Sequence, residues 1–124
     1  GYTLADLISK ELKKISKSNI KLCSLKINKK NPLNNMEFDF KLMEMKNKSI
    51  ILIDDVLNSG RTLLYGVKFI LGIPLSNFNT VVLVDRNHKK FPIKVDFKGI
   101  SLSTSIEENV NVVFENNKSY AFID

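Results

Sequence analysis

Two short aliphatic runs, each ending in aspartate, constrain the fold of this chain more than any other feature. The run IILI at residues 50–53 leads into Asp54, and the run VVLV at residues 81–84 leads into Asp85. An unbroken run of this kind is typical of a parallel strand that helices cover on both faces. Between them, residues 62–71 place apolar side chains at helical spacing. This order predicts an α/β fold with a doubly wound, mainly parallel sheet flanked by helices.

The flanking segments fit the same fold. Apolar residues between Leu4 and Ile15 repeat at helical spacing, and Thr3 is placed to cap that helix. No repeat, linker or internal boundary interrupts the sequence, so we expect one domain over residues 1–124. Because the helical pattern starts directly after Gly1, we expect an N-terminal element of the fold to be missing. Shorter patterns predict strands at residues 20–27, 36–43, 96–102, 110–114 and 119–123.

Charge and composition narrow the classes of partner and site. The net charge of +6 fits a partner that carries phosphates, although a solvated lysine surface explains it equally well. Two of the 19 basic residues are arginine, Arg61 and Arg86, and each follows an expected strand. Cys23 and His88 are the only residues of their types, which excludes thiolate and multi-histidine metal sites. No apolar run reaches the roughly 20 residues of a membrane span, and we expect a cytoplasmic protein.

The first aspartate pair stands directly before a turn that suits phosphate. Asp54 and Asp55 precede NSGRT at residues 58–62, which opens the expected helix. Amide groups at a helix start bind phosphate, and a glycine lets the backbone approach the anion. The sequence lacks both common phosphate motifs, GxxxxGK[ST] and GxGxxG. Acids beside a phosphate turn fit a phosphorylated ribose, whose hydroxyls donate to carboxylates. The alternative, that the acids only cap the turn, stays open here.

The stretch IILIDDVLNSGRT at residues 50–62 resembles the 5-phosphoribosyl-1-pyrophosphate (PRPP) motif of type I phosphoribosyltransferases. That motif has four aliphatic residues, two acids, two aliphatic residues and a small polar loop ending in Thr or Ser. The resemblance implies that Asp54 and Asp55 are catalytic, binding the ribose hydroxyls directly or through Mg²⁺. It also implies a loop for the 5′-phosphate made of Asn58, Ser59, Gly60, Arg61 and Thr62.

A second block, residues 81–114, is similar to bifunctional pyrimidine-operon attenuator / uracil phosphoribosyltransferase proteins. It contains VDRNH, a basic stretch, Pro-Ile and a later Thr-Ser followed by paired acids. The resemblance implies a small hood at residues 28–41. It implies that Arg86 is catalytic, and that Asp85 and Gly1 lie on the pyrophosphate and metal side, with Asp85 as a third metal ligand. The base-binding residues that it implies are Lys94 and Val110.

The activity that follows from the resemblance is a Mg²⁺-dependent transfer of the 5-phosphoribosyl group from PRPP to a nucleobase, with release of pyrophosphate. Purine members usually carry an acid where this chain has Asn58, and an amide cannot act as a general acid or base. Uracil is therefore the favoured acceptor. Two alternatives remain: a nucleotide-sensing regulator of pyrimidine genes that binds RNA, and a sugar-phosphate sensor without turnover. A homodimer is expected.

Overall fold

The computed structural model describes residues 1–28, 30–31, 37–105, 107–115 and 118–124. The described elements follow one another along the chain as α1 (Tyr2–Ile15), β1 (Leu25–Lys26), β2 (Glu37–Phe38), the short 3-10 helix η1 (Leu42–Met45), β3 (Ser49–Leu57), α2 (Arg61–Ile70), β4 (Asn77–Asp85), β5 (Phe97–Ser101), β6 (Val110–Phe114) and β7 (Ser119–Ile123).

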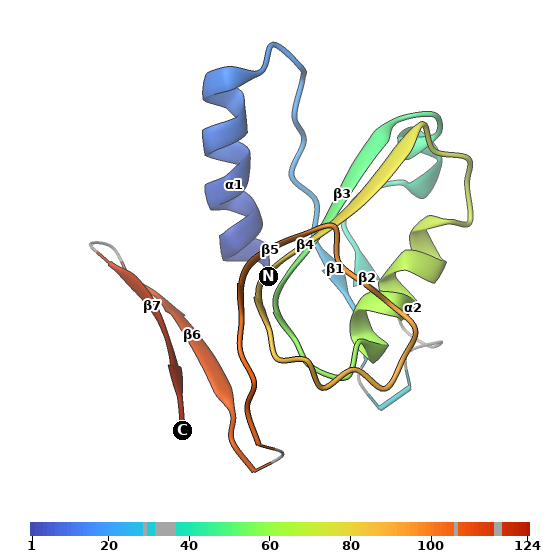
Figure 1. The fold of residues 1–124 in the computed structure, drawn as a ribbon. Helices are drawn as coiled ribbons and strands as arrows, with labels where there is room; N and C mark the ends of the chain where they lie inside the picture. The colour runs from blue at the N-terminus through green and yellow to red at the C-terminus, as the bar shows by residue number, and fades with distance from the viewer. Residues whose placement is uncertain (29, 32–36, 106, 116–117) are drawn as a thin grey trace.

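The centre of the molecule is a parallel sheet with the strand order β3-β4-β5 (Figure 1). The register pairs Leu57 at the end of β3 with Asp85 at the end of β4. Val82 and Val84 of β4 are 1% and 0% exposed, as expected for a strand covered on both faces. The two aliphatic runs thus form the parallel strands that the sequence predicts, and both strands end at the same edge of the sheet.

The two longer helices lie on opposite sides of β3 and β4 in Figure 1. Helix α2 packs closely because Gly66 has no side chain: a Cβ there would lie 3.2 Å from Cδ2 of Leu52. Its buried Leu63 joins Val82 and other apolar residues in the core cluster between helix and sheet. The predicted α/β architecture is therefore confirmed.

Two antiparallel hairpins complete the described structure. Strand β1 pairs with β2, and β6 pairs with β7 in a register that sets Val110 opposite Ile123. In Figure 1 the β6–β7 hairpin lies on the side of the sheet away from α2, and β6 contacts β3. This contact brings β6 to the strand that carries the acidic pair.

The observed bounds of some strands and helices differ from those that the sequence predicts. The strand predicted at residues 20–27 is reduced to β1, which among the described residues pairs with Glu37 and Phe38 of β2. Thr3 does not cap α1, because the helix already begins at Tyr2 with Gly1 as its N-cap. The expected hood at residues 28–41 includes residues 29 and 32–36, which lie outside the described residues. Within the described part of the chain, no helix has the length and hydropathy that a membrane span requires.

Candidate functional site

The acidic pair lies inside β3, because the strand continues two residues beyond Asp55 to Leu57. Each carboxylate is held by the backbone: the Asp55 amide donates to Asp54 Oδ1 at 2.9 Å, and the Val56 amide donates to Asp55 Oδ1 at 3.0 Å. Both side chains are half-buried. The strand thus fixes two neighbouring carboxylates at its carboxyl end, the edge where ligands bind in open parallel sheets.

Burial and charge act together on Asp54. Burial, and after it the charge of the neighbouring Asp55 carboxylate, together raise the pKa of Asp54 to about 6. A ligand that donates hydrogen bonds or carries positive charge would stabilise the ionised pair. The two acids are therefore placed for sugar hydroxyls or a cation rather than for an anion.

The turn after β3 is shaped for an anion. Gly60 is the N-cap of α2 and has φ +86°, a left-handed conformation that glycine adopts without strain. The Arg61 amide donates to Ser59 Oγ at 3.3 Å. The next amides, those of Thr62 and Leu63, belong to the first turn, where N–H groups have no partner within a helix. These groups can receive one phosphate beside the acids.

A cavity of about 390 Å³ joins the acids, the turn and β6. Asn111 and Val112 of β6 also line it, and sequence reasoning missed both. Their alternating pattern indicates a strand but not where that strand packs. The expected site residues that the structure brings together around this cavity are Asp54, Asp55, Asn58, Ser59, Gly60, Thr62 and Val110.

A second cavity is larger, about 670 Å³, and lies between α1, residues 18–27, β3 and α2. Aliphatic side chains such as Ile8, Leu12 and Leu22 make up most of its lining. It shares Asp54, Thr62 and Leu63 with the smaller cavity, but neither Asp55 nor the turn at residues 58–60 lines it. We place the site in the smaller cavity because its groups suit a charged sugar phosphate.

Arg86 is not open to a ligand as the resemblance implies. The residue is 8% exposed, and its Nη1 donates to Asn58 Oδ1 at 2.8 Å. Its Nε donates to Thr104 Oγ1 at 3.0 Å, and Nη2 donates to the carbonyl oxygens of Ser105 and Glu108. All three guanidinium nitrogens are thus engaged within the protein. The residue ties the end of β4 to the turn after β3 and to the segment before β6.

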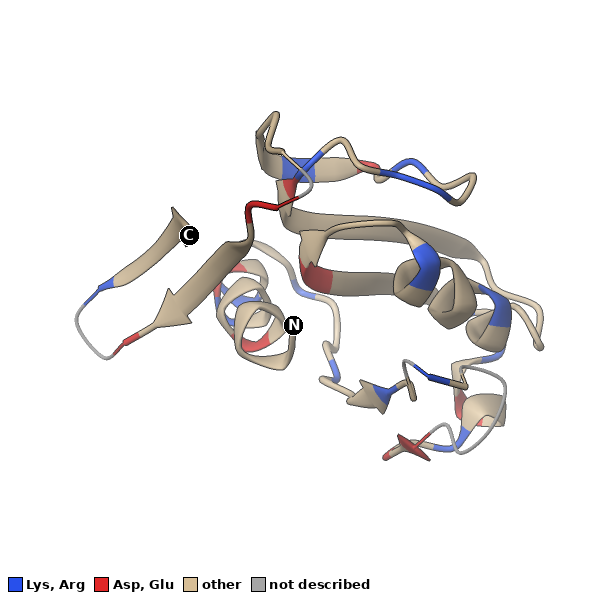
Figure 2. Cartoon of the chain, turned by 90° about the horizontal axis from the view of Figure 1, so that it is seen from below, with Lys and Arg blue, Asp and Glu red and all other residues tan. Residues whose placement is uncertain are grey.

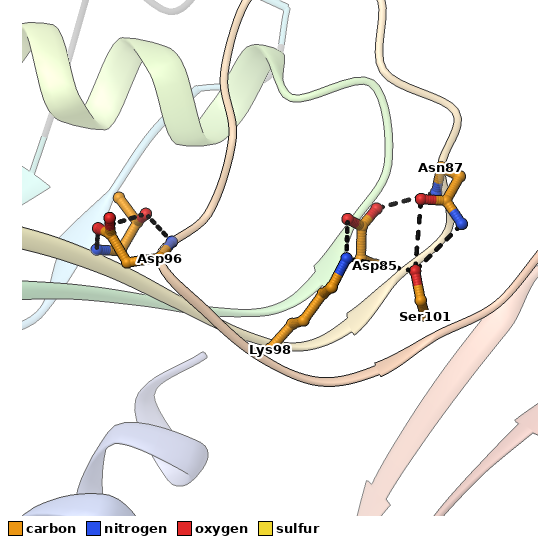
Figure 3. A network of polar contacts seen from close by, with 6 residues as sticks. Asp85, Asn87, Asp96, Lys98 and Ser101 are labelled. Carbon is orange, nitrogen blue, oxygen red and sulfur yellow. Dashed lines mark hydrogen bonds and ion pairs between the residues drawn. The ribbon is translucent and has the colours of Figure 1, made fainter.

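Asp85 also differs from the expectation, as Figure 3 shows. Its side chain is 4% exposed, lies 3.6 Å from Lys98 Nζ, and accepts the Asn87 amide at 2.9 Å. Ser101 extends the network by hydrogen bonding to Asn87. Asp85 does not line the cavity with Asp54. The carboxylate expected to be a third metal ligand is paired with a lysine instead.

The other expected site residues, Lys94, Arg61 and Gly1, do not line this cavity. Lys94 is exposed in the loop before β5, and the Arg61 guanidinium carbon is 5.9 Å from the centre of the Tyr65 ring. Gly1 lies against β3, where a Cβ would be 2.9 Å from the Ile53 carbonyl oxygen. Of these three residues, Gly1 alone reaches the acidic pair, through its backbone.

Mg²⁺ is the cation that the resemblance implies for this site. The described residues hold no cluster of three or more His, Cys, Asp or Glu side chains that could enclose a metal. Asp54 and Asp55 nevertheless fit, because Mg²⁺ is commonly bound by one or two carboxylates together with substrate phosphates. The pair could hold such an ion only with oxygens from a ligand or water.

A family model described as the phosphoribosyl transferase domain matches residues 1–116. The Bifunctional protein PyrR of Actinobacillus succinogenes is 30% identical over 125 residues, covering 90% of this chain and 69% of the relative. The protein of the same name from Clostridium novyi is 42% identical over 73 residues, covering 57% of this chain and 40% of the relative. Further relatives of that name are matched over 39–46% of their length.

Solved structures agree with the fold. The hypoxanthine phosphoribosyltransferase of Trypanosoma cruzi has a TM-score of 0.70 at 17% identity, covering 90% of this chain and 58% of that chain. The enzyme of that name from Staphylococcus aureus has a TM-score of 0.64 at 18% identity, covering 82% and 58%. At these identities the likeness concerns the arrangement of helices and strands.

Proposed function

The chain belongs to the phosphoribosyl transferase domain family, and on this premise we propose that it transfers the 5-phosphoribosyl group of PRPP to a nucleobase, with uracil as the favoured acceptor. The observation that carries the proposal is the 390 Å³ cavity in which Asp54 and Asp55 stand beside the turn that opens α2. One wall offers acceptors for a diol and the other offers donors for a phosphate. A ribose 5-phosphate carries both groups on one small ring.

The residues would divide the substrate between them. Asp54 and Asp55 accept hydrogen bonds from the 2′- and 3′-hydroxyls, and the amides of Thr62 and Leu63 at the start of α2 hold the 5′-phosphate. The nucleobase lies toward β6, where Val110 lines the cavity. Mg²⁺, when bound with PRPP, supplies charge neutralisation for the leaving pyrophosphate. Within the protein, Asp54 and Asp55 are the residues that would hold it, and Asp85 stays paired with Lys98.

In the reaction a nitrogen of the base forms a bond to C1 of the ribose while the bond from C1 to pyrophosphate breaks, and the proton of that nitrogen passes to the released pyrophosphate or to water. The positive charge that develops on the ring resembles that in glycoside transfer. The protein forms no bond to the substrate. It contributes by holding the two reactants in line and by placing negative charge near the sugar.

An activity screen tests the proposal directly. The purified protein is incubated with PRPP, Mg²⁺ and a panel of bases, and pyrophosphate release is followed. We expect release with uracil and none with the Asp54→Asn/Asp55→Asn double variant. Equal release from wild type and double variant would contradict the site. Binding of PRPP without release for any base would favour a sensor without turnover.

A second function, a nucleotide-sensing regulator that binds RNA, is favoured by one contact. The amides of Lys90 and Phe91 both donate to the carbonyl oxygen of Ser59, at 2.8 and 3.1 Å. The basic loop at residues 86–94 is thereby joined to the turn at residues 58–62, so a ligand in the cavity could influence that loop. Figure 2, in contrast, shows lysine and arginine spread over several elements rather than gathered on one face. We therefore rank this function second.

The homodimer and the cytoplasmic location stay predictions. Sedimentation of the purified protein tests the dimer, and fractionation of cells that express it tests the location.

A further inference from the structure

The side chain of Asn58 has one group engaged by the protein and one group left for a ligand. Its Oδ1 accepts from Arg86, while Asn58 itself lines the 390 Å³ cavity. A guanidinium has only donors, so the amide atom that faces it at 2.8 Å must be the oxygen. Among the hydrogen bonds of the described residues, none uses the Nδ2 group of Asn58. The amide nitrogen is therefore the group that the cavity can use.

Arg86 cannot turn to release this arrangement. Besides Asn58 it donates to Thr104 Oγ1 and to two backbone carbonyls, and it is 8% exposed. The segment that accepts these bonds is itself braced, since the Ser105 amide donates to Glu108 Oε1 at 2.8 Å. A flipped Asn58 amide would set its NH₂ group against the guanidinium, donor against donor. The orientation of Asn58 is thus set by a buried group on another strand.

We infer that Arg86 is a positioning residue that makes Asn58 a fixed hydrogen-bond donor to the cavity, and that Asn58 thereby selects nucleobases that present a carbonyl oxygen rather than an amino group. The inference rests on the proposed function, because it assigns the base edge that the phosphoribosyl site accepts. A carbonyl satisfies the Nδ2 donor. An amino group meets it with another donor and leaves both groups unsatisfied, which is the strongest form of discrimination by a polar site.

An aspartate at this position would reverse the preference. One carboxylate oxygen would keep the bond to Arg86, and the other would face the cavity as an acceptor. The variant Asn58→Asp therefore changes the chemistry offered to the base without removing the contact that orients the side chain. Since Asn58 is exposed at the cavity, the substitution leaves the core untouched.

The test compares UMP with CMP, which share ribose and 5′-phosphate and differ by a carbonyl or an amino group on the base. Dissociation constants are measured by isothermal titration calorimetry for wild type, Asn58→Asp and Asn87→Asp. The last is a matched control, because Asn87 is exposed, lies outside the cavity and gains the same charge. The added carboxylate repels the phosphate of UMP and of CMP equally, so this effect cancels in the ratio of their dissociation constants.

We expect wild type and Asn87→Asp to bind UMP about tenfold or more tightly than CMP, as an unsatisfied polar pair predicts. In Asn58→Asp this preference for UMP over CMP should fall by at least about tenfold. A ratio unchanged by Asn58→Asp would overturn the inference and would mean that Nδ2 faces the sugar phosphate or solvent.

A second variant tests the role of Arg86. Arg86→Met keeps a long side chain but donates no hydrogen bond, so the Asn58 amide becomes free to turn and the UMP to CMP ratio should approach one. Thr104→Val removes one bond to Arg86 but leaves the bond to Asn58, so its ratio should stay near that of wild type. If Arg86→Met does not fold, the UMP to CMP ratio of Asn58→Asp alone decides whether the inference stands. Wild type that binds neither nucleotide nor PRPP would overturn the proposed function and the inference with it.

Discussion

Gly60 lies so close to Ile93 that a Cβ atom on Gly60 would be 2.6 Å from Cγ2 of Ile93. The contact joins the phosphate turn to the loop between β4 and β5. Two backbone hydrogen bonds from that loop to Ser59 strengthen the same junction. The turn is therefore supported from behind by the loop, and its shape does not depend on local sequence alone.

Gly60→Ala should destabilise the protein and weaken phosphate binding together. The left-handed φ of +86° and the contact with Ile93 both oppose a side chain. We expect a loss of about 2–4 kcal/mol in the free energy of unfolding, measured by urea denaturation. Gly72→Ala is the control, because Gly72 has no positive φ and meets its nearest atom at 3.3 Å. Equal stability of the two variants would contradict the close approach at Gly60.

Asp54→Asn should stabilise the protein without ligand above neutral pH. The pKa of Asp54 is raised to about 6 from 3.8, so the folded state holds this proton more tightly than the unfolded chain. Its contribution to stability is therefore present below pH 4 and is lost as pH rises through about 6. We expect the variant to exceed wild type by about 1–2 kcal/mol at pH 7.5, allowing for partial exposure.

Urea denaturation at pH 7.5 and at pH 3.5 checks this result. The advantage of Asp54→Asn should disappear at the lower pH, where wild type carries the proton. Asp6→Asn removes a carboxylate paired with Lys10 on the surface of α1 and should show no such change. A variant less stable than wild type at pH 7.5 would show that Asp54 is a structural cap.

Arg61→Ala should weaken 5′-phosphate ligands only about twofold, because the charge that it removes is exposed, lies over Tyr65 and does not line the cavity. Its guanidinium lies over Tyr65, while its backbone amide donates to Ser59 in the turn. Affinity for ribose 5-phosphate, followed by NMR titration, measures the effect. A loss of a hundredfold would mean that the side chain swings onto the phosphate. Lys68→Ala, another exposed cation on α2, serves as the control.

If the chain binds RNA, the loop after β4 should carry part of that affinity. Lys89 and Lys90 are exposed there. Each phosphate contact that they make adds about one to the slope with which the logarithm of the binding constant falls against the logarithm of the salt concentration. We expect Lys89→Ala/Lys90→Ala to lower the slope by about two in filter binding. Lys13→Ala/Lys14→Ala on α1 removes the same charge elsewhere. Equal effects of the two double variants would indicate general charge attraction rather than a site.

The sequence was enough to predict the parallel sheet and a turn at Gly60 that opens a helix, because each depends on neighbours along the chain. The aliphatic runs before Asp54 and Asp85 indicate buried strands, and Gly60 marks the turn. The surroundings of Arg86 were not predictable. Its partners Asn58 and Thr104 are 28 and 18 residues away, and only the packed sheet brings them together.

The same reasoning explains Asp85. Its place after an aliphatic run suggests a ligand-binding acid, yet Lys98 reaches it from the neighbouring strand β5. Cross-strand partners depend on register, which the sequence of β4 alone does not contain. Asn111 could not be assigned to the site from the sequence for a related reason, since β6 contacts β3 only in the folded chain.

On the proposed function, Asp54 and Asp55 bind the ribose of PRPP beside the turn that opens α2. Calorimetric titration of PRPP with Mg²⁺ into wild type and the Asp54→Asn/Asp55→Asn variant tests it most directly. We expect PRPP to bind to wild type and to bind at least about a hundredfold more weakly to the variant, since two charge-assisted hydrogen bonds are lost. Unchanged affinity in the folded variant would contradict it.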